Sequence, residues 1–492
     1  MGNLLKNYIA GKWLESHGQG SVEVLNPANK ELLASTPLGT YDDANEAVIA
    51  AADAFEAWKK TPAQDRIQYF FKLKSKMEEH CSDLSHIITQ EHGKTIAESM
   101  GEIRRAIQMV ETACGIPSLM MGENFEDIAR GIDCSTVNRP MGVFACVAPF
   151  NFPAMIPFWF WPFAVACGNT YVLKASERVP LTSLRIFELI EEVGFPPGVV
   201  NLVHGGKEVA NALCKHPLVK GISFVGSTPV AKHIYSTACS EGKRVQALGG
   251  AKNVMVVLPD AMQGELGKKS VTTAVESITG CAGERCLAGS LVLCVGDETY
   301  EKFKSEAMVT VNTMKTGDGL DDQTNMGPLI SQDAKDRVAG LIEMSVTEGA
   351  EVLIDGRQGV DHLPGYFLRP SLLAQINPAM KIAREEVFGP VILVSKVDSL
   401  DDAIEWINSI PFANTCTLFT NSGGDARAFA SQVDPSMIGI NIGVPAPMAY
   451  FSFGGSKQSF FGDIKAHGQA SIKFFTDTCT TIYRWHSKSS IW

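Results

Sequence analysis

A short apolar run gives way to a glycine turn and then to a helix at Gly221-Ile222-Ser223-Phe224-Val225-Gly226-Ser227-Thr228-Pro229. The run reads as a buried strand, and the helix extends to about Ser240. A strand joined to a helix through a glycine turn is the repeating unit of parallel α/β sheets. The backbone amides at such a helix N-terminus also suit a pyrophosphate. A purely structural turn is the alternative, because the dinucleotide fingerprint G-x-G-x-x-G is absent.

The same alternation of strand and helix continues on both sides of this unit. Apolar strands are expected at 143–148, 170–174, 199–203, 244–248 and 254–258, with helices between them at 181–193 and 209–216. After residue 260 the alternation repeats, with a strand at 291–295 and helices at 264–278, 298–314, 334–348 and 400–408. Strands that alternate with helices predict parallel sheets covered on both faces. We therefore expect an α/β fold with two doubly wound parallel-sheet domains.

Composition narrows the class of protein. The chain has 492 residues, of which 45% are hydrophobic and 20% charged, as in an ordinary soluble protein of two or three domains. Its net charge of −11 argues against nucleic acid and an anionic membrane surface as partners. The apolar run 152–167 is short for a membrane span and holds three prolines. We interpret it as a buried helix beside the active site.

The cysteines indicate the compartment. Twelve are dispersed along the chain without a C-x-x-C pair or a spacing typical of zinc ligands, so we expect no metal site and a reducing environment. The N-terminal residues 1–6 contain no long apolar signal core. These features favour a cytoplasmic protein.

The segment Gly280-Cys281-Ala282-Gly283-Glu284-Arg285-Cys286-Leu287-Ala288 places a thiol at the end of a glycine turn. Glycines let the backbone approach a substrate closely, and the adjacent Arg285 lowers a thiol pKa and can hold an anion. Cys286 is therefore the candidate nucleophile, and Cys281 is its rival. The structural alternative is that both are buried, inert cysteines.

Two further segments follow predicted strands. Asn151, in Pro149-Phe150-Asn151-Phe152-Pro153, is a polar residue among aromatics, and its amide is a suitable oxyanion donor. Lys174 and Glu177 are placed to hold the ribose hydroxyls of an adenosine, although a solvated loop is the alternative reading.

Over nearly its full length the chain resembles the aldehyde dehydrogenase superfamily. The matching segments are 149–153, 174–177, 226–228, 248–250, 283–286 and 385–390, in the family's order. The resemblance implies that Cys286 attacks an aldehyde carbon, that Asn151 and the Cys286 amide hold the oxyanion, and that hydride passes to NAD. It also implies a set of NAD-binding residues: Ala148, Phe150, Lys174, Glu177, Arg178, Ser227, Gly249 and Glu386.

One position departs from the common family pattern. The family places a glutamate directly before Leu-Gly-Gly as the base that activates hydrolytic water, and here that residue is Ala247. The segments 224–231, 244–253, 283–286 and 459–463 resemble the methylmalonate-semialdehyde dehydrogenase branch, which acylates coenzyme A. This branch implies a methylmalonate or malonate semialdehyde whose carboxylate is held by Arg285 and Arg105, with adjacent Arg104 as the alternative to Arg105. It also implies loss of CO₂ and a role in valine, inositol or β-alanine breakdown.

The resemblance also implies how the chain is divided. Residues 1–118 and 141–250 would form the NAD-binding domain, 251–455 the catalytic domain, and 119–140 with 456–492 a small β oligomerisation arm in a homodimer or homotetramer. The alternating, threonine-rich end from Ile472 suits an edge strand that pairs with another subunit. Two other classes stay open, a hydrolytic aldehyde dehydrogenase for another semialdehyde and a catalytically silent binding protein on the same fold.

Overall fold

The first large sheet has eight strands in the order β2-β1-β9-β8-β7-β10-β11-β21 in the computed structural model, which describes residues 4–485. Strands β7 to β11 are mutually parallel, whereas β1, β2 and β21 extend the sheet in antiparallel pairings. The bounds are β1 (Asn7–Ile9), β2 (Lys12–Leu14), β7 (Val143–Val147), β8 (Thr170–Lys174), β9 (Val200–Val203), β10 (Val219–Val225), β11 (Arg244–Leu248) and β21 (Phe460–Phe461).

Helices cover both faces of this sheet, as the fully apolar strands predict. In β7, Val143 and Ala145 pack into one cluster with α1, α9 and α10, whereas Phe144 and Cys146 pack into another with α2, α4, α7 (Trp161–Ala166) and α8. This period-2 alternation divides each strand between two cores. The helices are α1 (Tyr41–Trp58), α2 (Ala63–Glu79), α3 (Cys81–His92), α4 (Ile96–Ala113), α5 (Ile116–Leu119), α8 (Leu181–Val193), α9 (Lys207–Lys215) and α10 (Thr228–Ser240).

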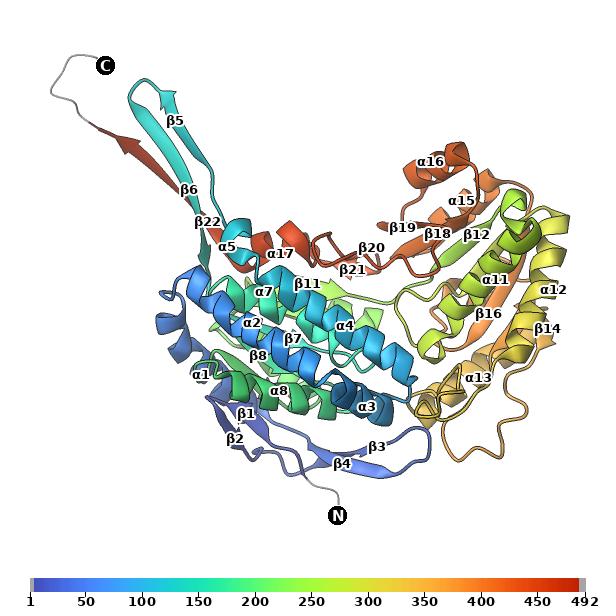
Figure 1. The fold of residues 1–492 in the computed structure, drawn as a ribbon, viewed down its shortest axis with the longest axis horizontal. Coiled ribbons are helices and arrows are strands. Elements are labelled where there is room, and N and C mark those ends of the chain that lie inside the picture. The colour runs from blue at the N-terminus through green and yellow to red at the C-terminus, as the bar shows by residue number, and fades with distance from the viewer. Residues whose placement is uncertain (1–3, 486–492) are drawn as a thin grey trace.

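The second large sheet has seven strands in the order β14-β15-β16-β13-β12-β18-β19, and all its pairings are parallel except that of β14. Its faces are covered by α11 and α12 on one side and by α13, α15 and α16 on the other. The two sheets lie side by side in Figure 1. The bounds are β12 (Val254–Val257), β13 (Leu291–Val295), β14 (Glu351–Ile354), β15 (Ser371–Ala374), β16 (Val391–Val397), β18 (Thr415–Phe419), β19 (Met437–Ile440), α11 (Gly264–Thr279), α12 (Asp297–Thr313), α13 (Gln332–Thr347), α14 (Lys381–Arg384), α15 (Leu400–Ser409) and α16 (Gly423–Gln432).

A three-stranded arm projects from the first sheet (Figure 1). It consists of β22 (Thr476–Arg484), β6 (Ile132–Pro140) and β5 (Asn124–Ala129), in that order. The prediction of a strand from Ile472 onward was wrong at its start, because residues 468–475 form helix α17 (Gly468–Phe475). The apolar side chains of this helix are buried in the main core, and the strand begins only where the exposed alternation starts. β22 pairs along β6 of its own chain, and residues 486–492 lie outside the described part.

Two small two-stranded sheets complete the described strands. In one of them, β20 (Ser456–Lys457) pairs with β17 (Phe412–Ala413), whereas β21 belongs to the first large sheet. The residues of β20 and β21, which fall within the range 456–492 expected to belong to the arm, therefore lie outside the arm sheet. Strands β3 (Ser21–Leu25) and β4 (Leu32–Pro37) form a separate hairpin. Residues 1–3, which include the start of the segment tested for a signal core, lie outside the described residues.

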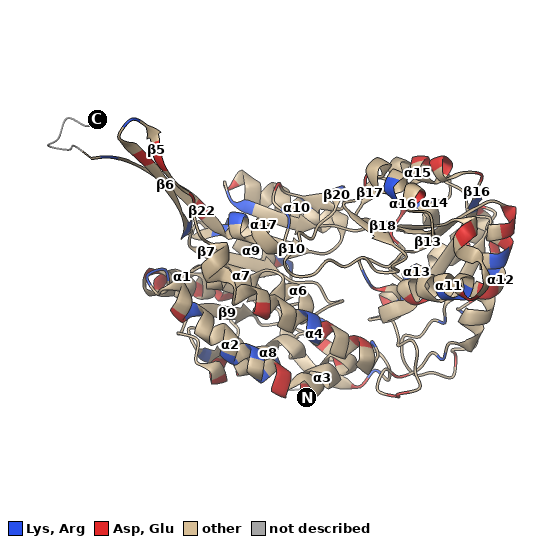
Figure 2. Cartoon of the chain, turned by 45° about the horizontal axis from the view of Figure 1, so that its top comes forward, with Lys and Arg blue, Asp and Glu red and all other residues tan. Residues whose placement is uncertain are grey.

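The apolar run 152–167 forms two short helices instead of the single helix expected, α6 (Met155–Phe158) and α7 (Trp161–Ala166). Nearly all of its residues are buried, in the same core as α2 and α4. Within residues 4–485, no helix combines the length and apolarity that a membrane crossing needs. Acidic and basic residues are interspersed along outer helices such as α4 and α12 (Figure 2).

Candidate active site

The cysteine segment forms a strained turn after α11. A 3-10 turn spans Gly280–Gly283, and Cys281, Ala282 and Gly283 have φ values of 52°, 52° and 74°. Non-glycine residues seldom adopt this left-handed conformation, and consecutive examples occur mainly where function requires them. A Cβ at Gly283 would clash with the carbonyl oxygen of Gly389, so only glycine fits there. The turn redirects the chain so that Cys286 borders a cavity.

Hydrogen bonds from distant elements fix this turn. The backbone N–H of Cys281 donates to Oε1 of Glu98 at 2.6 Å. The carbonyl oxygen of Cys286 accepts hydrogen bonds from Nδ2 of Asn253 at 2.8 Å and from Nδ2 of Asn414 at 3.0 Å. Both asparagines are buried. The backbone of Cys286 is therefore held on two sides, as a preorganised nucleophile requires.

The cavity beside Cys286 has a volume of about 320 Å³. It brings together Cys286, Cys281, Arg105 and Arg285, which come from α4 and from the cysteine segment. Arg104 is exposed and does not line the cavity, so the structure places Arg105 there. The remaining wall is mainly apolar: Met109, Phe152, Met155, Trp159, Leu287, Val444, Ala446, Pro447 and Phe453, together with Gly101, Glu98, Glu102 and His467.

Neither cavity arginine forms an ion pair within residues 4–485. Nη2 of Arg105 donates to the carbonyl oxygen of Ala446 at 3.3 Å, and Nη2 of Arg285 donates to the carbonyl oxygen of Glu276 at 3.3 Å. Carbonyl oxygens orient a guanidinium without neutralising it. Glu98 and Glu102 also line the cavity, but Glu102 is paired with Lys94 and Glu98 accepts the Cys281 N–H. The two arginines therefore keep donors that can bind an anionic ligand.

The pKa of the Cys286 thiol differs from the expectation based on Arg285. Burial and the nearby Glu386 carboxylate raise the pKa of Cys286 to about 12, and Arg285 offsets only part of this rise. Arg285 therefore lowers the Cys286 pKa, as predicted, but its effect is smaller than the opposing effects of burial and Glu386, so the net shift is upward. Burial and the Glu98 carboxylate raise the pKa of Cys281 to about 12 as well. Acidity does not distinguish the two thiols, but accessibility does: Cys281 is buried whereas Cys286 is partly exposed.

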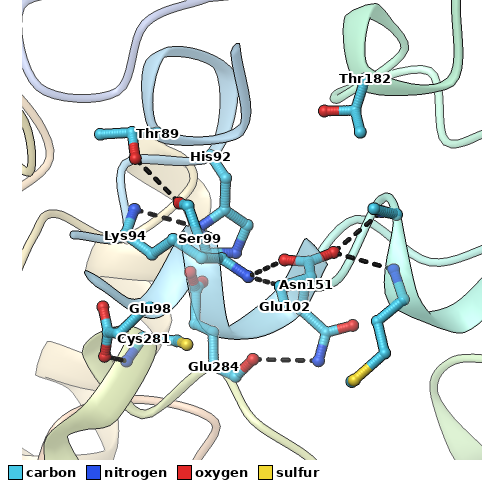
Figure 3. A network of polar contacts seen from close by, with 12 residues as sticks. Thr89, His92, Lys94, Glu98, Ser99, Glu102, Asn151, Thr182, Cys281 and Glu284 are labelled. Atoms are coloured by element: carbon cyan, nitrogen blue, oxygen red, sulfur yellow. Dashed lines mark hydrogen bonds and ion pairs between the residues drawn. The ribbon is translucent and has the colours of Figure 1, made fainter. Parts of the chain in front are cut away.

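Asn151 lies against the cysteine segment and belongs to a buried polar network (Figure 3). Its side-chain Nδ2 donates to the backbone carbonyl oxygen of Glu284 at 3.0 Å. The backbone carbonyl oxygen of Asn151 accepts a hydrogen bond from Nζ of Lys94 at 2.6 Å. Nζ of Lys94 also donates to Glu102, whose other oxygen accepts the backbone N–H groups of Ala154 and Met155. A side-chain amide has two N–H donors, so one remains for a ligand.

The predicted cofactor residues lie at one edge of the first sheet, because parallel strands end together. Ala148 and Phe150 follow β7, Lys174 ends β8, Ser227 precedes α10 and Gly249 follows β11. The Phe150 ring stacks on His92 and meets Phe388 edge-on. Nζ of Lys174 contacts Oε2 of Glu177 at 2.7 Å. Burial alone would raise the pKa of Glu177, but this ion pair lowers it below its ordinary value.

Two members of the predicted cofactor set, Arg178 and Glu386, lie near elements of the second sheet's side. Arg178 is exposed and lies 4.0 Å from Asp333 of α13. Glu386 comes from the second sheet's side, and a Cβ added at Gly250 would lie 2.6 Å from its Oε2, so a larger residue at this position would displace the Glu386 carboxylate. Burial raises the pKa of Glu386 to about 7 and lowers that of the neighbouring Lys252 to about 7.

Ala247 is fully buried in β11, between Phe224 of β10 and Phe461 of β21. A methyl group cannot activate water. Both carboxylates that line the cavity already accept hydrogen bonds from backbone N–H groups, Glu98 from Cys281 and Glu102 from Ala154 and Met155. The cavity therefore offers no carboxylate free of structural contacts.

Sequence reasoning did not identify several residues of this site, namely Lys94, Glu98, Glu102, Asn253 and Asn414. Each is polar and mostly or fully buried. The hydrogen-bond partners of these residues lie far away along the chain, so no local pattern marks them as part of the site. The one local feature is the position of Lys94 directly after Gly93, which ends helix α3.

A two-sheet α/β protein with a thiol, an amide donor and a strand-end cofactor edge has the architecture of the aldehyde dehydrogenases. The model of the aldehyde dehydrogenase family matches residues 13–481. The chain therefore belongs to this family, and the resemblance seen in the sequence is confirmed.

Particular relatives are closely similar. The chain is 44% identical over 482 residues to malonate-semialdehyde dehydrogenase 1 of Geobacillus thermodenitrificans, covering 98% of this chain and 99% of the relative. A methylmalonate-semialdehyde dehydrogenase structure from Oceanimonas doudoroffii superposes with a TM-score of 0.96 at 39% identity, covering 99% of both chains. A structure from Sinorhizobium meliloti, assigned as the same enzyme and solved with NAD, gives a TM-score of 0.96 at 36% identity, again covering 99% of both.

Proposed function

We propose that this enzyme oxidises malonate or methylmalonate semialdehyde with NAD and transfers the acyl group to coenzyme A. The observation that carries the proposal is the single cavity in which Cys286 meets two arginines that have no acidic partner in the described chain. The names of the similar proteins, which cover both semialdehydes, support the same substrate class.

The residues at the strand ends fit NAD. The turn after β10 leads into the N-terminus of α10, which suits a pyrophosphate. Lys174 and Glu177 would hold the adenosine ribose, and Glu386, for which Gly250 leaves room, would hold the nicotinamide ribose. Ala148, Phe150, Arg178, Ser227 and Gly249 complete the proposed set. When bound there, NAD supplies the hydride acceptor.

In the first half-reaction, the Cys286 thiol gives up its proton to solvent water, and its sulfur bonds to the aldehyde carbon. Negative charge develops on the aldehyde oxygen, where the free N–H of Asn151 and the Cys286 backbone amide stabilise it. The strained turn and the two asparagines on the Cys286 carbonyl keep the sulfur in place. Loss of hydride then leaves an acyl thioester on Cys286.

The substrate carboxylate would lie between Arg105 and Arg285. The spacing between aldehyde and carboxylate is short in these semialdehydes, and both arginines line the cavity that Cys286 borders. Binding to fixed guanidinium groups orients the aldehyde toward the sulfur, which converts binding energy into reactivity.

In the second half-reaction, the acyl group must leave Cys286. Water needs a base, but Ala247 supplies none, and Glu98 and Glu102 are engaged by backbone N–H groups. The thiol of coenzyme A is ionised to a few per cent at neutral pH and is a far better nucleophile than water. These features favour acyl transfer to coenzyme A over hydrolysis.

The acyl group itself can lose its carboxylate. A carboxylate β to a thioester carbonyl leaves as CO₂ and transfers its electron pair into an enolate, whose oxygen is held by the same donors that held the first oxyanion. The products would be acetyl-coenzyme A from malonate semialdehyde and propionyl-coenzyme A from methylmalonate semialdehyde.

The division of the chain is also part of the proposal. Residues 1–118 and 141–250 would bind NAD, 251–455 would supply the catalytic turn, and 119–140 with the strand of 456–492 would form an oligomerisation arm. In the arm sheet, β22 has a partner only on one side within the described chain. The exposed Phe125 and Ile482 lie on this arm, which favours a homodimer or homotetramer.

The arginine clamp makes a testable prediction. Replacing Arg105 or Arg285 with methionine, which keeps the aliphatic length, should lower kcat/KM for 3-oxopropanoate by roughly 10- to 100-fold, the effect of losing a hydrogen-bonded charge partner. With Arg105→Met the uncharged aldehyde propanal should change by less than about threefold, because it has no carboxylate. Arg285→Met should also slow propanal, because Arg285 lowers the pKa of Cys286, but by clearly less than it slows the acid. Arg104→Met is the matched control, because Arg104 is exposed on the same helix. Equal losses on the acid and on propanal would remove the clamp from the account.

A further inference from the structure

His467 occupies an unusual place at the wall of the cavity. It directly precedes α17, it is 1% exposed, and it lines the cavity together with Arg105. Its backbone has φ 69° and ψ 165°, a region that is populated almost only by glycine. Strain of this kind persists only where the surroundings fix the residue, and it is concentrated at ligand-binding sites.

The surroundings of His467 do fix it. Ala466, its neighbour, exchanges two backbone hydrogen bonds with Phe453, at 2.8 and 3.0 Å. The N–H of Gly468 donates to the carbonyl oxygen of Ala449 at 3.0 Å. The imidazole ring lies against Trp159 and Phe453, with centroid distances of 5.3 and 5.2 Å. The side chain is therefore locked against the cavity by its backbone and by two aromatic rings.

The polar atoms of the ring are not used by the protein. Neither Nδ1 nor Nε2 of His467 has a hydrogen-bond partner within residues 4–485. A buried polar group without a partner is costly, and a phenylalanine would fill the same aromatic wall without this cost. Burial and the Arg105 guanidinium lower the pKa of His467 to about 3, so the ring is neutral and has one N–H donor at neutral pH.

We propose that His467 is a specificity-determining residue that donates an N–H hydrogen bond to the substrate carboxylate, beside Arg105. This inference rests on the proposed function and adds a neutral donor to the two charged ones. A carboxylate accepts up to four hydrogen bonds, so Arg105, Arg285 and His467 can share it. The neutral donor adds direction without adding charge. It selects aldehydes that carry a carboxylate over aldehydes of the same length that carry a methyl group.

Two substitutions separate the donor from the shape of the ring. His467→Phe keeps an aromatic ring but removes the donor, and His467→Asn keeps an N–H donor in a smaller side chain. We expect His467→Phe to lower kcat/KM for 3-oxopropanoate by roughly 10- to 100-fold, mainly through KM, while propanal changes by less than about threefold. His467→Asn should recover most of the loss. Equal losses on both substrates, or no recovery with asparagine, would overturn the proposal.

A second measurement does not depend on turnover, NAD or coenzyme A. 3-Bromopropanoate alkylates a thiol through C3, which is as far from its carboxylate as the aldehyde carbon is in 3-oxopropanoate. Sulfur displaces bromide, and a carbon–sulfur bond forms. The labelling rate of Cys286, followed by mass spectrometry, should favour 3-bromopropanoate over 3-bromopropanamide in the wild-type enzyme. His467→Phe should reduce this preference by roughly 10-fold or more.

The outcomes distinguish the two proposals. If the wild-type enzyme shows no preference for the bromo acid and does not oxidise 3-oxopropanoate, the proposed function fails. If the wild type shows the preference and His467→Phe retains it in full, only the role of His467 fails. NAD binding and the melting temperature of each variant identify a general loss of structure, and the asparagine variant then provides the decisive comparison.

Discussion

Replacing Cys286 with alanine is expected to lower NADH formation by roughly 10⁴-fold or more, because the acyl group then has no atom to bond to. The alanine variant should still bind NAD and melt at the wild-type temperature. The Cys286 side chain borders the cavity, and its backbone is held through its carbonyl oxygen, which the substitution leaves in place. Steady-state rates and NAD titration of the purified variant are the measurements.

The matched control is Cys281→Ala, five residues earlier in the same turn. Cys281 is buried, and its backbone N–H, which the substitution keeps, is the group that contacts Glu98. Most activity should therefore remain. If Cys281→Ala were inactive and Cys286→Ala active, the nucleophile would be Cys281 and the geometry of the site would need a different reading.

Replacing Asn151 with alanine is expected to lower kcat by roughly 10²–10³, the usual cost of one lost oxyanion donor. The hydrogen bond from Nζ of Lys94 to the backbone carbonyl oxygen of Asn151 survives the substitution, so the loop should keep its position. NAD binding should change little, because the side chain contacts Glu284 and not the strand-end residues. Single-turnover measurement of NADH formation isolates the chemical step.

Asn151→Asp is a useful companion, because aspartate has nearly the same shape but no N–H donors when ionised. It should be at least as slow as the alanine variant. A kcat within threefold of wild type for either variant would show that another group holds the oxyanion.

The strands of the two large sheets were predictable from the sequence, because both sheets are buried on both faces and their strands are therefore short apolar runs. Val143–Val147 and Thr170–Lys174 are short apolar runs, and turn residues follow them. The proposed site residues Asn151, Lys174 and Ser227 fall where strands end, which is why they could be predicted from the sequence. The strand ends have a clear local signal, because a periodic pattern breaks there, but the roles of these residues came from the family resemblance.

The supporting residues could not be predicted in the same way. Lys94 and Asn151 are 57 positions apart, and Glu98 and the Cys281 N–H are 183 apart. Such contacts depend on how α4 packs beside the cysteine turn, and no short-range pattern encodes that packing. His467 is a further example, since only the fold places it beside Arg105.

The pKa of the Cys286 thiol also could not be predicted from the sequence. Arg285 follows the expectation that it favours the thiolate, but burial and Glu386 outweigh it. Burial of a thiol and the approach of a carboxylate from another part of the chain are tertiary properties. The sign of the net pKa shift therefore required the structure.

The central claim is that the acyl group leaves Cys286 for coenzyme A and not for water, and rapid mixing of the enzyme with NAD and 3-oxopropanoate tests it most directly. Without coenzyme A, we expect a burst of about one NADH per active site, followed by slow turnover. Addition of coenzyme A should restore fast steady-state turnover, with acetyl-coenzyme A and CO₂ found by mass spectrometry and ping-pong kinetics in the rates. Fast steady-state NADH formation without coenzyme A, with a free acid as product, would contradict the account.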